Sequence, residues 1–547
     1  MKNTLLLCLL SISSFAQVKL AGFGNTDVRY NATNLPQQQT THTLEGWKGE
    51  KVNTQLVIYT SSPVAKASVK TGTFRKSDGK SLAFETKTGF VHYVWTDGLN
   101  KAGSGCGIPA NNQLDSSRVA DGIECINTKK IAANTVQPVW VSVRIPRHAE
   151  TGDYKSDIII VIDGKAYPLT LNIKVKDHVL PEPSKWQFHL DLWQNPYSIA
   201  RVHNVKPMTP AFFKAATPYM KMLADAGQKT ITVSMIHDPW RSQTYDIYQS
   251  MIKWTKKKDG SWAYDYTIFD QWVSYMMSIG IDKLINCYSM VPWNNRFYYY
   301  DEAAGRDTVL VAQTGTPEYN AHWRPMLQNF AQHLKQKNWY HKTAIAMDER
   351  PLADMLKVVA LVKSADKDFK ISLAGTYHRE LGEDIYDYCI SAAEIFEADI
   401  MEKRLKASLP TTFYTCCVEA RPNTFTFSPP AESTWMGWFA ANKGFNGYLR
   451  WAYNCWPANP MTDSRFGTWS AGDTYFVYPN AGSSIRFEKL IEGLQDYEKI
   501  RILRAGVINA SQLEQLNKTV QQFELGALAK ETAAEMLQKA RTVLNSL

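Results

Sequence analysis

The sequence predicts an α/β protein in which a (β/α)8 barrel follows an N-terminal β-sandwich domain. Three observations predict this fold. The first part of the chain carries short alternating strand patterns with no long helical pattern between them. A proline-containing segment, VLPEPSKW, then marks a domain boundary. Beyond it, eight apolar strand-like runs alternate with helical patterns, which is the arrangement of a (β/α)8 barrel.

The first residues read as a secretory signal peptide. MKNTLLLCLLSISSFAQ carries a lysine, a short apolar core and small residues before a cleavage position after Ala16. The apolar core is too short to span a bilayer as an anchor. Residues 1–16 are therefore predicted to be a signal peptide, and the mature protein is predicted to be exported, either periplasmic or secreted, without a membrane span.

Residues 17–180 are predicted to form the N-terminal β-sandwich domain. NTQLVIYT, PVWVSVRIP and KSDIIIVIDGKAYPLTLNIKVK have the alternation and β-branched content of strands. Gly, Asn, Asp and Pro separate these strands. No helical pattern interrupts them, which is typical of two packed sheets.

Residues 185–505 are predicted to form the barrel, and residues 506–547 a C-terminal helical segment. Helical patterns such as PLADMLKVVALVKSAD fill most gaps between the barrel strands. The fifth and sixth units are short. The predicted strands are residues 186–193, 229–236, 282–290, 343–349, 370–377, 387–393, 411–419 and 447–454.

Composition excludes several classes of protein. The net charge of +9 is small for 547 residues. The sequence also has no long Lys/Arg block of the kind that predicts nucleic-acid binding. The run KWTKKKDG is better explained as an exposed hairpin turn. No HExxH or CxxC motif is present, so neither a metal nor another cofactor is expected.

The cysteines do not form a disulfide scaffold. Of eight cysteines, Cys8 lies in the predicted signal peptide, and the remaining seven are an odd number. Cys106 and Cys125 flank a loop-like segment and are candidates for one bridge. The other cysteines lie in apolar runs, where a buried thiol is expected.

Acidic and aromatic residues gather at the predicted strand ends, where barrel enzymes build their active sites. Asp348 and Glu349 end the fourth strand, and Glu419 ends the seventh. Carboxylates among Trp and Tyr are typical of a carbohydrate site, because sugar faces stack on aromatic rings while acids bind hydroxyls and cleave the glycosidic bond. Other strand-end candidates are Asp191, Trp193, His237, Asp238, Trp293, Asn294, Tyr377, His378, Trp451, Tyr453, Asn454 and Trp456.

Each candidate also has a structural explanation. Asp348 and Glu349 precede Pro351, so they suit the first turn of a helix, where the N-terminal dipole favours acids. From spacing alone, this capping explanation is the simpler one. Trp451 and Tyr453 alone would be read as core aromatics.

Several stretches together resemble glycoside hydrolase family 123. They occur in the same order over nearly the whole mature chain: WKGEKVNTQLVIY, LPEPSKWQFHLDLWQNPYSIAR, AMDERP, RWAYNCWP and WSAGDTYFVYP running into SSIRFEKLIEGLQDYEKI. The resemblance implies a β-sandwich and a catalytic (β/α)8 barrel. It also implies an exo-acting, retaining β-N-acetylgalactosaminidase with an adjacent Asp-Glu pair, which Asp348 and Glu349 match.

An adjacent acid pair fits a substrate-assisted mechanism. The nucleophile is then the carbonyl oxygen of the sugar's 2-acetamido group, so no second carboxylate is needed across the bond. Asp348 is expected to orient the acetamido N–H and to stabilise the oxazolinium ion. Glu349 is expected to act as general acid and then as general base, with ionised Asp348 raising its pKa.

Further residues are expected to bind a glycan with a terminal β-linked N-acetylgalactosamine. Tyr377 is expected to donate a hydrogen bond to the acetamido carbonyl. The predicted stacking wall consists of Trp451, Tyr453 and Trp456. The residues expected to meet the hydroxyls are Asp191, Trp193, Asn454 and Asp473.

Two alternatives stay open at this stage. In one, the barrel is a retaining glycosidase of other sugar specificity, with Glu419 as a protein nucleophile and Asp348 as a supporting residue. In the other, the protein binds glycans without cleaving them.

Overall fold

The computed structural model describes residues 18–98, 116–466 and 469–547. The predicted signal peptide and Cys106 lie outside these residues, so export stays a prediction of the sequence. The chain divides into two compact units. The first contains the described residues up to Val91 together with Glu124–His178, and the second contains the described residues of 92–123 and Val179–Leu547. The described residues of 92–123, expected in the N-terminal domain, thus group with the second unit.

The first unit is a β-sandwich, as predicted. Within this unit, one sheet contributes strands in the order β1-β3-β10-β7, and the other sheet has the order β2-β12-β11-β4-β9, with β5 and β6 at its side. Antiparallel register pairs β3 with both β1 and β10. The strands are β1 (Val18–Gly24), β2 (Thr41–Lys48), β3 (Lys51–Thr60), β4 (Val64–Thr71), β5 (Phe74–Lys76), β6 (Ser81–Leu82), β7 (Glu85–Thr96), β9 (Lys129–Ile131), β10 (Thr135–Arg144), β11 (Gly152–Ile162) and β12 (Lys165–Val179).

Both sheets contribute to one apolar core. In β11 every second residue from Tyr154 to Ile162 is buried, because successive side chains of a strand point to opposite faces. Ile158 and Ile160 of this strand share a cluster with Leu56 and Ile58 of β3 on the other sheet. This shared core stabilises the sandwich.

The second unit is built on eight parallel strands, as predicted. Their order around the sheet is β13-β24-β23-β22-β21-β20-β17-β14, so strands that follow each other in sequence are neighbours. A parallel bridge between Leu190 and Gln228 joins the two end strands and completes a near-barrel. The strands are β13 (His189–Leu192), β14 (Thr230–Ser234), β17 (Leu284–Tyr288), β20 (Thr343–Asp348), β21 (Lys370–Ala374), β22 (Asp387–Ser391), β23 (Thr411–Tyr414) and β24 (Gly447–Arg450).

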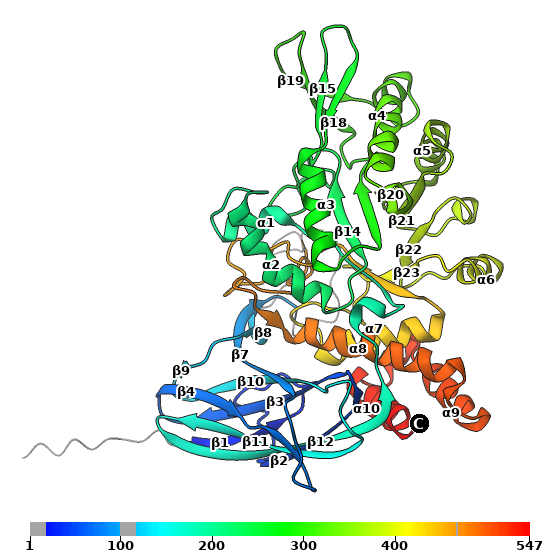
Figure 1. Ribbon diagram of the computed structural model, residues 1–547. Coiled ribbons are helices and arrows are strands. Elements are labelled where there is room, and N and C mark those ends of the chain that lie inside the picture. Colours follow the sequence, from blue (N-terminus) through cyan, green and yellow to red (C-terminus); the bar gives the residue numbers. More distant parts are fainter. Residues whose placement is uncertain (1–17, 99–115, 467–468) are drawn as a thin grey trace, which may run out of the picture. The chain divides into compact units, whose positions relative to one another are not determined.

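Helices follow most of these strands and surround the barrel (Figure 1). The fifth unit is reduced to a 3-10 turn, Arg379–Leu381, and the sixth has the short helix α6. The helices are α1 (Pro196–Val202), α2 (Pro210–Ala224), α3 (Thr267–Ile279), α4 (Pro317–Gln336), α5 (Leu352–Ala365), α6 (Ala398–Lys406), α7 (Pro430–Lys443), α8 (Ile485–Ile502), α9 (Ala510–Val520) and α10 (Ala533–Ser546).

The α4 helix illustrates how the sequence forms these elements. The Thr316 hydroxyl accepts a hydrogen bond from the backbone N–H of Tyr319, and Pro317 occupies the first helical position. A hydroxyl cap and a proline there are favourable helix starts. Tyr319, Trp323 and Phe330 recur at helical spacing and are buried on one face.

Two antiparallel hairpins are inserted after the second and third barrel strands. They form a separate four-stranded sheet of β15 (Lys253–Lys256), β16 (Trp262–Asp265), β18 (Arg296–Asp301) and β19 (Arg306–Val311). The Lys253–Gly260 run therefore lies in a hairpin, as its composition predicts.

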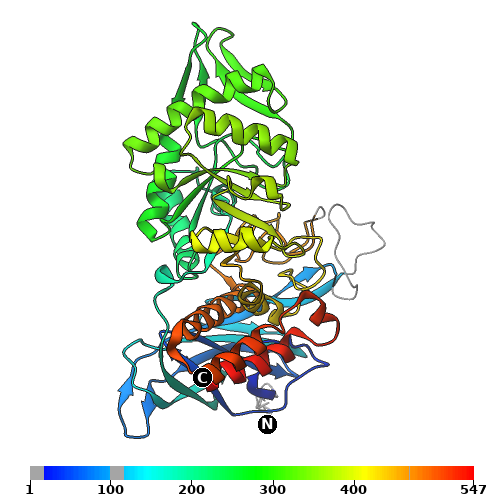
Figure 2. The same cartoon turned by 90° about the vertical axis from the view of Figure 1, so that its right-hand side faces the viewer.

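The C-terminal helices belong to the second unit. Both α9 and α10 contact α7, which itself packs along α8 (Figure 2). Asn509 and Thr532 form capping boxes that start α9 and α10. Among the described residues, no helix has the length and apolar character needed to cross a membrane.

Candidate active site

The acid pair lies at the carboxyl end of β20. Asp348 is the last residue of this strand, and Glu349 follows with a φ of 42°. Adjacent residues of a regular strand would face opposite ways. The left-handed backbone at Glu349 turns the chain, while its N–H still donates to the Ala374 carbonyl at 2.7 Å. Both acids consequently line one pocket.

The turn needs a glycine directly after the neighbouring strand, β21. A Cβ atom at Gly375 would lie 3.0 Å from both the Cα and the backbone nitrogen of Glu349. This contact is closer than side chains normally tolerate. Gly375 therefore leaves room for the backbone that aims Glu349.

Gly375→Ala is accordingly expected to lower kcat by roughly tenfold to a hundredfold, because a small displacement of a catalytic group has a large effect on rate. Steady-state kinetics measures this loss. Gly526→Ala is the matched control, since its new Cβ meets nothing within 4 Å. Wild-type kcat in Gly375→Ala would show that the close approach does not position Glu349.

Asp348 is a buried carboxylate with one oxygen hydrogen-bonded and the other without a partner among the described residues. It is 6% exposed, and its Oδ2 accepts a hydrogen bond of 2.9 Å from Trp293 Nε1. Its Oδ1 is buried and has no partner among the described residues. Burial raises the pKa of Asp348 to about 6, an effect that Arg350 and the Trp293 hydrogen bond oppose and that Glu349 reinforces. Oδ1 is thus a buried acceptor without a protein partner, on a residue that lines the pocket.

Glu349 is exposed to solvent and is held by a tyrosine. The Tyr414 hydroxyl, at the end of β23, donates to Glu349 Oε1 at 3.0 Å. The other carboxylate oxygen of Glu349 is left for a ligand. An exposed, tethered carboxyl group suits proton exchange with a substrate and with water.

Tyr414→Phe is expected to lower kcat about tenfold with little change in KM, because a hydrogen bond to a charged group is worth about 1.5–3 kcal/mol. The Tyr266 hydroxyl bonds Asn329 outside the pocket, so Tyr266→Phe is the matched control. Equal kinetics for Tyr414→Phe and the wild type would contradict a positioning role for this hydroxyl.

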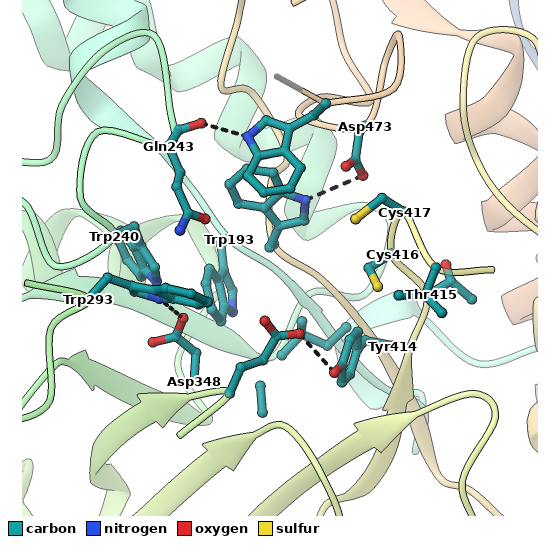
Figure 3. Close-up of a pocket in the computed structure, with 16 residues that line it drawn as sticks. Trp193, Trp240, Gln243, Trp293, Asp348, Tyr414, Thr415, Cys416, Cys417 and Asp473 are labelled. Atoms are coloured by element: carbon teal, nitrogen blue, oxygen red, sulfur yellow. Dashed lines mark hydrogen bonds between the residues drawn. The ribbon is translucent and has the colours of Figure 1, made fainter. Parts of the chain in front are cut away.

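The pocket has a volume of about 420 Å³, within the range of small-molecule sites. Figure 3 shows Trp193, Trp240 and Trp293 near Asp348, and Tyr414 and Asp473 at other parts of the wall. Aromatic side chains thus supply stacking faces beside three acids. The pocket is lined by Trp193, Trp240, Gln243, Trp293, Asp348, Glu349, Ala374, Tyr414, Thr415, Cys416, Cys417, Val418, Leu449, Trp451, Trp469 and Asp473.

Asp473 has a second buried acceptor without a partner among the described residues. Its Oδ1 receives hydrogen bonds from the buried Arg450 guanidinium at 2.5 Å and from Trp451 Nε1 at 3.3 Å. Its Oδ2 is buried without a partner among the described residues. Burial raises the pKa of Asp473, while Arg450 opposes that rise. Its place in the pocket fits the expected contact with a sugar hydroxyl.

Of the ten residues predicted for the site, the structure brings five to the pocket. These are Asp348, Glu349, Trp193, Trp451 and Asp473. The other five do not line it, which corrects the expectation that they contact the sugar. These five are Asp191, Tyr377, Tyr453, Asn454 and Trp456.

Three of these five lie in the buried chain after β24. Tyr453 and Trp456 have no exposed surface, and their polar hydrogens go to the carbonyls of Tyr219 and Val477. The Asn454 side chain accepts from the Asn195 N–H and donates to the Asn195 carbonyl. These side chains stabilise the fold rather than face the pocket.

The remaining two lie within the barrel and on a neighbouring loop. Asp191 is 2% exposed beside Gln228, and burial raises its pKa well above the ordinary value. Tyr377 packs against Tyr388 and Phe396. Tyr414, not Tyr377, is the tyrosine that reaches the acid pair.

The structure also places Glu419 outside the pocket. Its Oε1 accepts from Ser391 and its Oε2 from the Cys416 backbone, both at 2.8 Å. Both oxygens are engaged in holding the loop after β23. The arrangement gives Glu419 a structural role and removes the geometric basis for Glu419 as nucleophile.

The helix-capping explanation of the acid pair is also corrected. Pro351 occupies the cap position of α5, and Asp354 is the acid in its first turn. Asp348 and Glu349 face the pocket instead.

The expected cysteine pairing is wrong as well. Cys125 is an exposed thiol, whereas Cys417, expected to be a buried thiol, is disulfide-bonded. Cys417 lines the pocket, so a covalent cross-link fixes part of its wall.

Some pocket residues escaped sequence reasoning. Tyr414 was not among the strand-end candidates because the seventh strand was predicted to run to residue 419, whereas β23 ends at Tyr414. Trp240, Gln243 and Trp469 lie in loops beyond the strand ends. Trp469 Nε1 donates to the Gln243 carbonyl at 3.0 Å, and only the folded loops bring these residues together.

A near-barrel with paired acids in an aromatic pocket at the strand ends defines a carbohydrate-cleaving enzyme. A sequence model described as the glycoside hydrolase 123 catalytic domain matches residues 193–503, and one described as the glycoside hydrolase 123 N-terminal domain matches residues 23–162. The chain therefore belongs to glycoside hydrolase family 123.

One solved structure agrees with this membership. A family 123 glycoside hydrolase from Clostridium perfringens, described in relation to glycolipid glycan hydrolysis, aligns with a TM-score of 0.86 and 27% identity. The alignment covers 96% of this chain and 97% of that one. A β-glucuronidase from Parabacteroides merdae aligns with a TM-score of only 0.32 and 10% identity, over 88% of this chain and 52% of that one. No curated protein sequence matches the chain.

Proposed function

We propose that this glycoside hydrolase is an exo-acting β-N-acetylgalactosaminidase that retains configuration through a substrate-assisted mechanism. The observation that carries the proposal is the acid pair itself. Asp348 has a buried Oδ1 without a partner among the described residues, and Glu349 has an exposed carboxyl group; both residues line one pocket. The first suits an acetamido N–H and the second suits proton transfer.

In the first step, the acetamido carbonyl oxygen attacks the anomeric carbon while the glycosidic C–O bond breaks. Glu349 donates its proton to the departing oxygen, which leaves as an alcohol. Asp348 Oδ1 accepts a hydrogen bond from the acetamido N–H and stabilises the positive charge of the oxazolinium ring. The Trp293 hydrogen bond to Oδ2 keeps the carboxylate oriented.

In the second step, Glu349 is a carboxylate and takes a proton from water. The water oxygen attacks the anomeric carbon, and the oxazolinium C–O bond breaks to restore the acetamido group. Two displacements at one carbon retain the configuration. Glu349 ends protonated, ready for another cycle.

The remaining pocket residues support sugar binding. The exposed faces of Trp293 and Trp451 offer stacking surfaces, and Asp473 Oδ2 offers an acceptor for a hydroxyl. The similarity to the Clostridium perfringens enzyme makes glycolipid glycans a reasonable source of the terminal sugar. The single terminal sugar fits an exo-acting enzyme with a pocket of this size.

Hydrolysis of aryl glycosides tests the proposal. Nitrophenol release is expected from the β-N-acetylgalactosaminide, with less from the β-N-acetylglucosaminide. A cyclic thiazoline mimic of the oxazolinium ring should inhibit strongly, and NMR should show the β-anomer as the first product. Covalent labelling of a carboxylate by a fluorosugar, without thiazoline inhibition, would instead establish a protein nucleophile.

A further inference from the structure

Arg350 follows the acid pair in sequence and does not line the pocket. It nevertheless contacts Trp293, the residue whose indole N–H bonds the Asp348 carboxylate. Its guanidinium carbon lies 4.0 Å from the centroid of the Trp293 ring, and its Nε donates to the Asp348 carbonyl at 2.5 Å. Trp293 Nε1 in turn bonds Asp348 Oδ2. One side chain thus touches both the backbone of Asp348 and the indole that holds its carboxylate.

The local sequence helps to fix this arrangement. Pro351 favours an extended backbone for the residue that precedes it, which restricts Arg350. The planar guanidinium stacks on an indole face better than a lysine ammonium group does. Nη2 is buried without a hydrogen-bond partner among the described residues, so this nitrogen is not held by a fold-stabilising contact of its own.

We infer that Arg350 is a positioning residue that acts through Trp293 to hold and ionise Asp348. This inference rests on the proposed function, in which Asp348 must be a fixed, charged acceptor. The guanidinium clamps the indole from one face, and the indole N–H then fixes Asp348 Oδ2. Its positive charge also favours the Asp348 carboxylate over the carboxylic acid.

Three titratable groups act on or near Asp348. Glu349 raises its pKa and Arg350 lowers it, while burial has the largest effect. Tyr288 of β17 interacts electrostatically with Asp348, and its own pKa is raised well above the ordinary value, so its hydroxyl stays neutral in the ordinary pH range. Loss of Arg350 therefore removes the cationic group that supports Asp348 ionisation.

The test is the pH profile of kcat/KM for Arg350→Met, measured on the aryl glycoside that the wild-type enzyme hydrolyses fastest. The acid limb is expected to move up by about one pH unit, so that the loss is about tenfold larger at pH 5.5 than at pH 8. Arg350→Lys keeps the charge without the stacking and should shift the limb less. Arg324→Met, which removes an exposed arginine bonded to Ser364, should keep the wild-type profile.

Trp293→Phe tests the route through the indole. It should also move the acid limb upward, and the double variant Arg350→Met/Trp293→Phe should lose less than the product of the two single losses. A uniform loss at every pH would give Arg350 a merely structural role. Independent, multiplicative effects would show that Arg350 does not act through Trp293.

If the wild-type enzyme cleaved only sugars without an acetamido group, the proposed function would be overturned. The pH profiles of the Arg350 and Trp293 variants could still be measured on the sugar that it does cleave. A second readout needs no activity. The thermal stability difference between Asp348→Asn and its parent should change with pH, and Arg350→Met should move the midpoint of that change upward. An unmoved midpoint would overturn the inference even if the proposed function holds.

Discussion

Glu349→Gln is expected to lower kcat about 10²–10⁴-fold, the range that general acid–base catalysis contributes. Glutamine keeps the shape of the side chain and can still accept the Tyr414 hydrogen bond, but it can neither donate the proton to the leaving group nor deprotonate water. The loss should be larger for a sugar leaving group than for nitrophenol, because nitrophenolate departs with little protonation.

Azide provides a sharper measurement on the same variant. Added azide needs no general base, so it should restore turnover and yield the β-glycosyl azide with retained configuration. Glu380→Gln removes an exposed acid outside the pocket and is the matched control. Nearly unchanged turnover in Glu349→Gln, for both leaving groups, would refute the assignment of Glu349 as acid and base.

Asp348→Asn is expected to reduce kcat about 10²–10³-fold and, at the same time, to make the protein more stable at pH 7. The activity falls because a neutral amide stabilises the oxazolinium charge poorly. For the same reason, wild-type kcat/KM should decline below a pH of about 6, as Asp348 becomes protonated.

The stability effect follows from the direction of the pKa shift. The pKa of Asp348 is raised from 3.8 to about 6 in the folded protein. The folded state therefore binds more protons than the unfolded state between these values, and stability falls as pH rises through that window. A shift of about two units corresponds to about 3 kcal/mol at most, which asparagine would relieve at pH 7.

Thermal unfolding at pH 4 and pH 7 measures this difference. Asp348→Asn should have a higher apparent Tm than the wild type at pH 7, by a few degrees, and nearly the same Tm at pH 4. Asn can still accept from Trp293 Nε1, so the packing is kept. A less stable variant at pH 7 would mean that the ionised carboxylate stabilises the fold instead of straining it.

Much of the fold could be predicted from the sequence because it depends on periodic burial. All eight barrel strands lie within the predicted ranges, since apolar runs of this length must be buried between helices. The linker after the sandwich could be predicted because its prolines separate the alternating strand pattern before it from the strand–helix pattern after it. The strand ends were harder to place: β23 ends at Tyr414, five residues before Glu419, because Glu419 turns back to bond the Cys416 N–H.

The site was predictable only in part, for a related physical reason. Asp348 and Glu349 are adjacent in sequence, so locating the end of the fourth barrel strand located both acids. Tyr453 and Trp456 have the residue types of a sugar-stacking wall, but their polar hydrogens bond backbone carbonyls of the core. Residue type alone does not separate these cases. Trp469 reaches the pocket through a long loop, and no periodicity in the sequence places such a loop.

The left-handed backbone at Glu349 has a consequence for how such an enzyme can evolve. Glycosidases with two facing carboxylates carry them on separate segments, so a change in their spacing, from about 5 Å to about 9 Å, exchanges retention for inversion. Here a single peptide unit joins the two acids, and no drift of surrounding segments can draw them apart. Under the proposed mechanism, the stereochemical course is thus tied to the covalent chain, and new specificity would come from changes in the pocket walls.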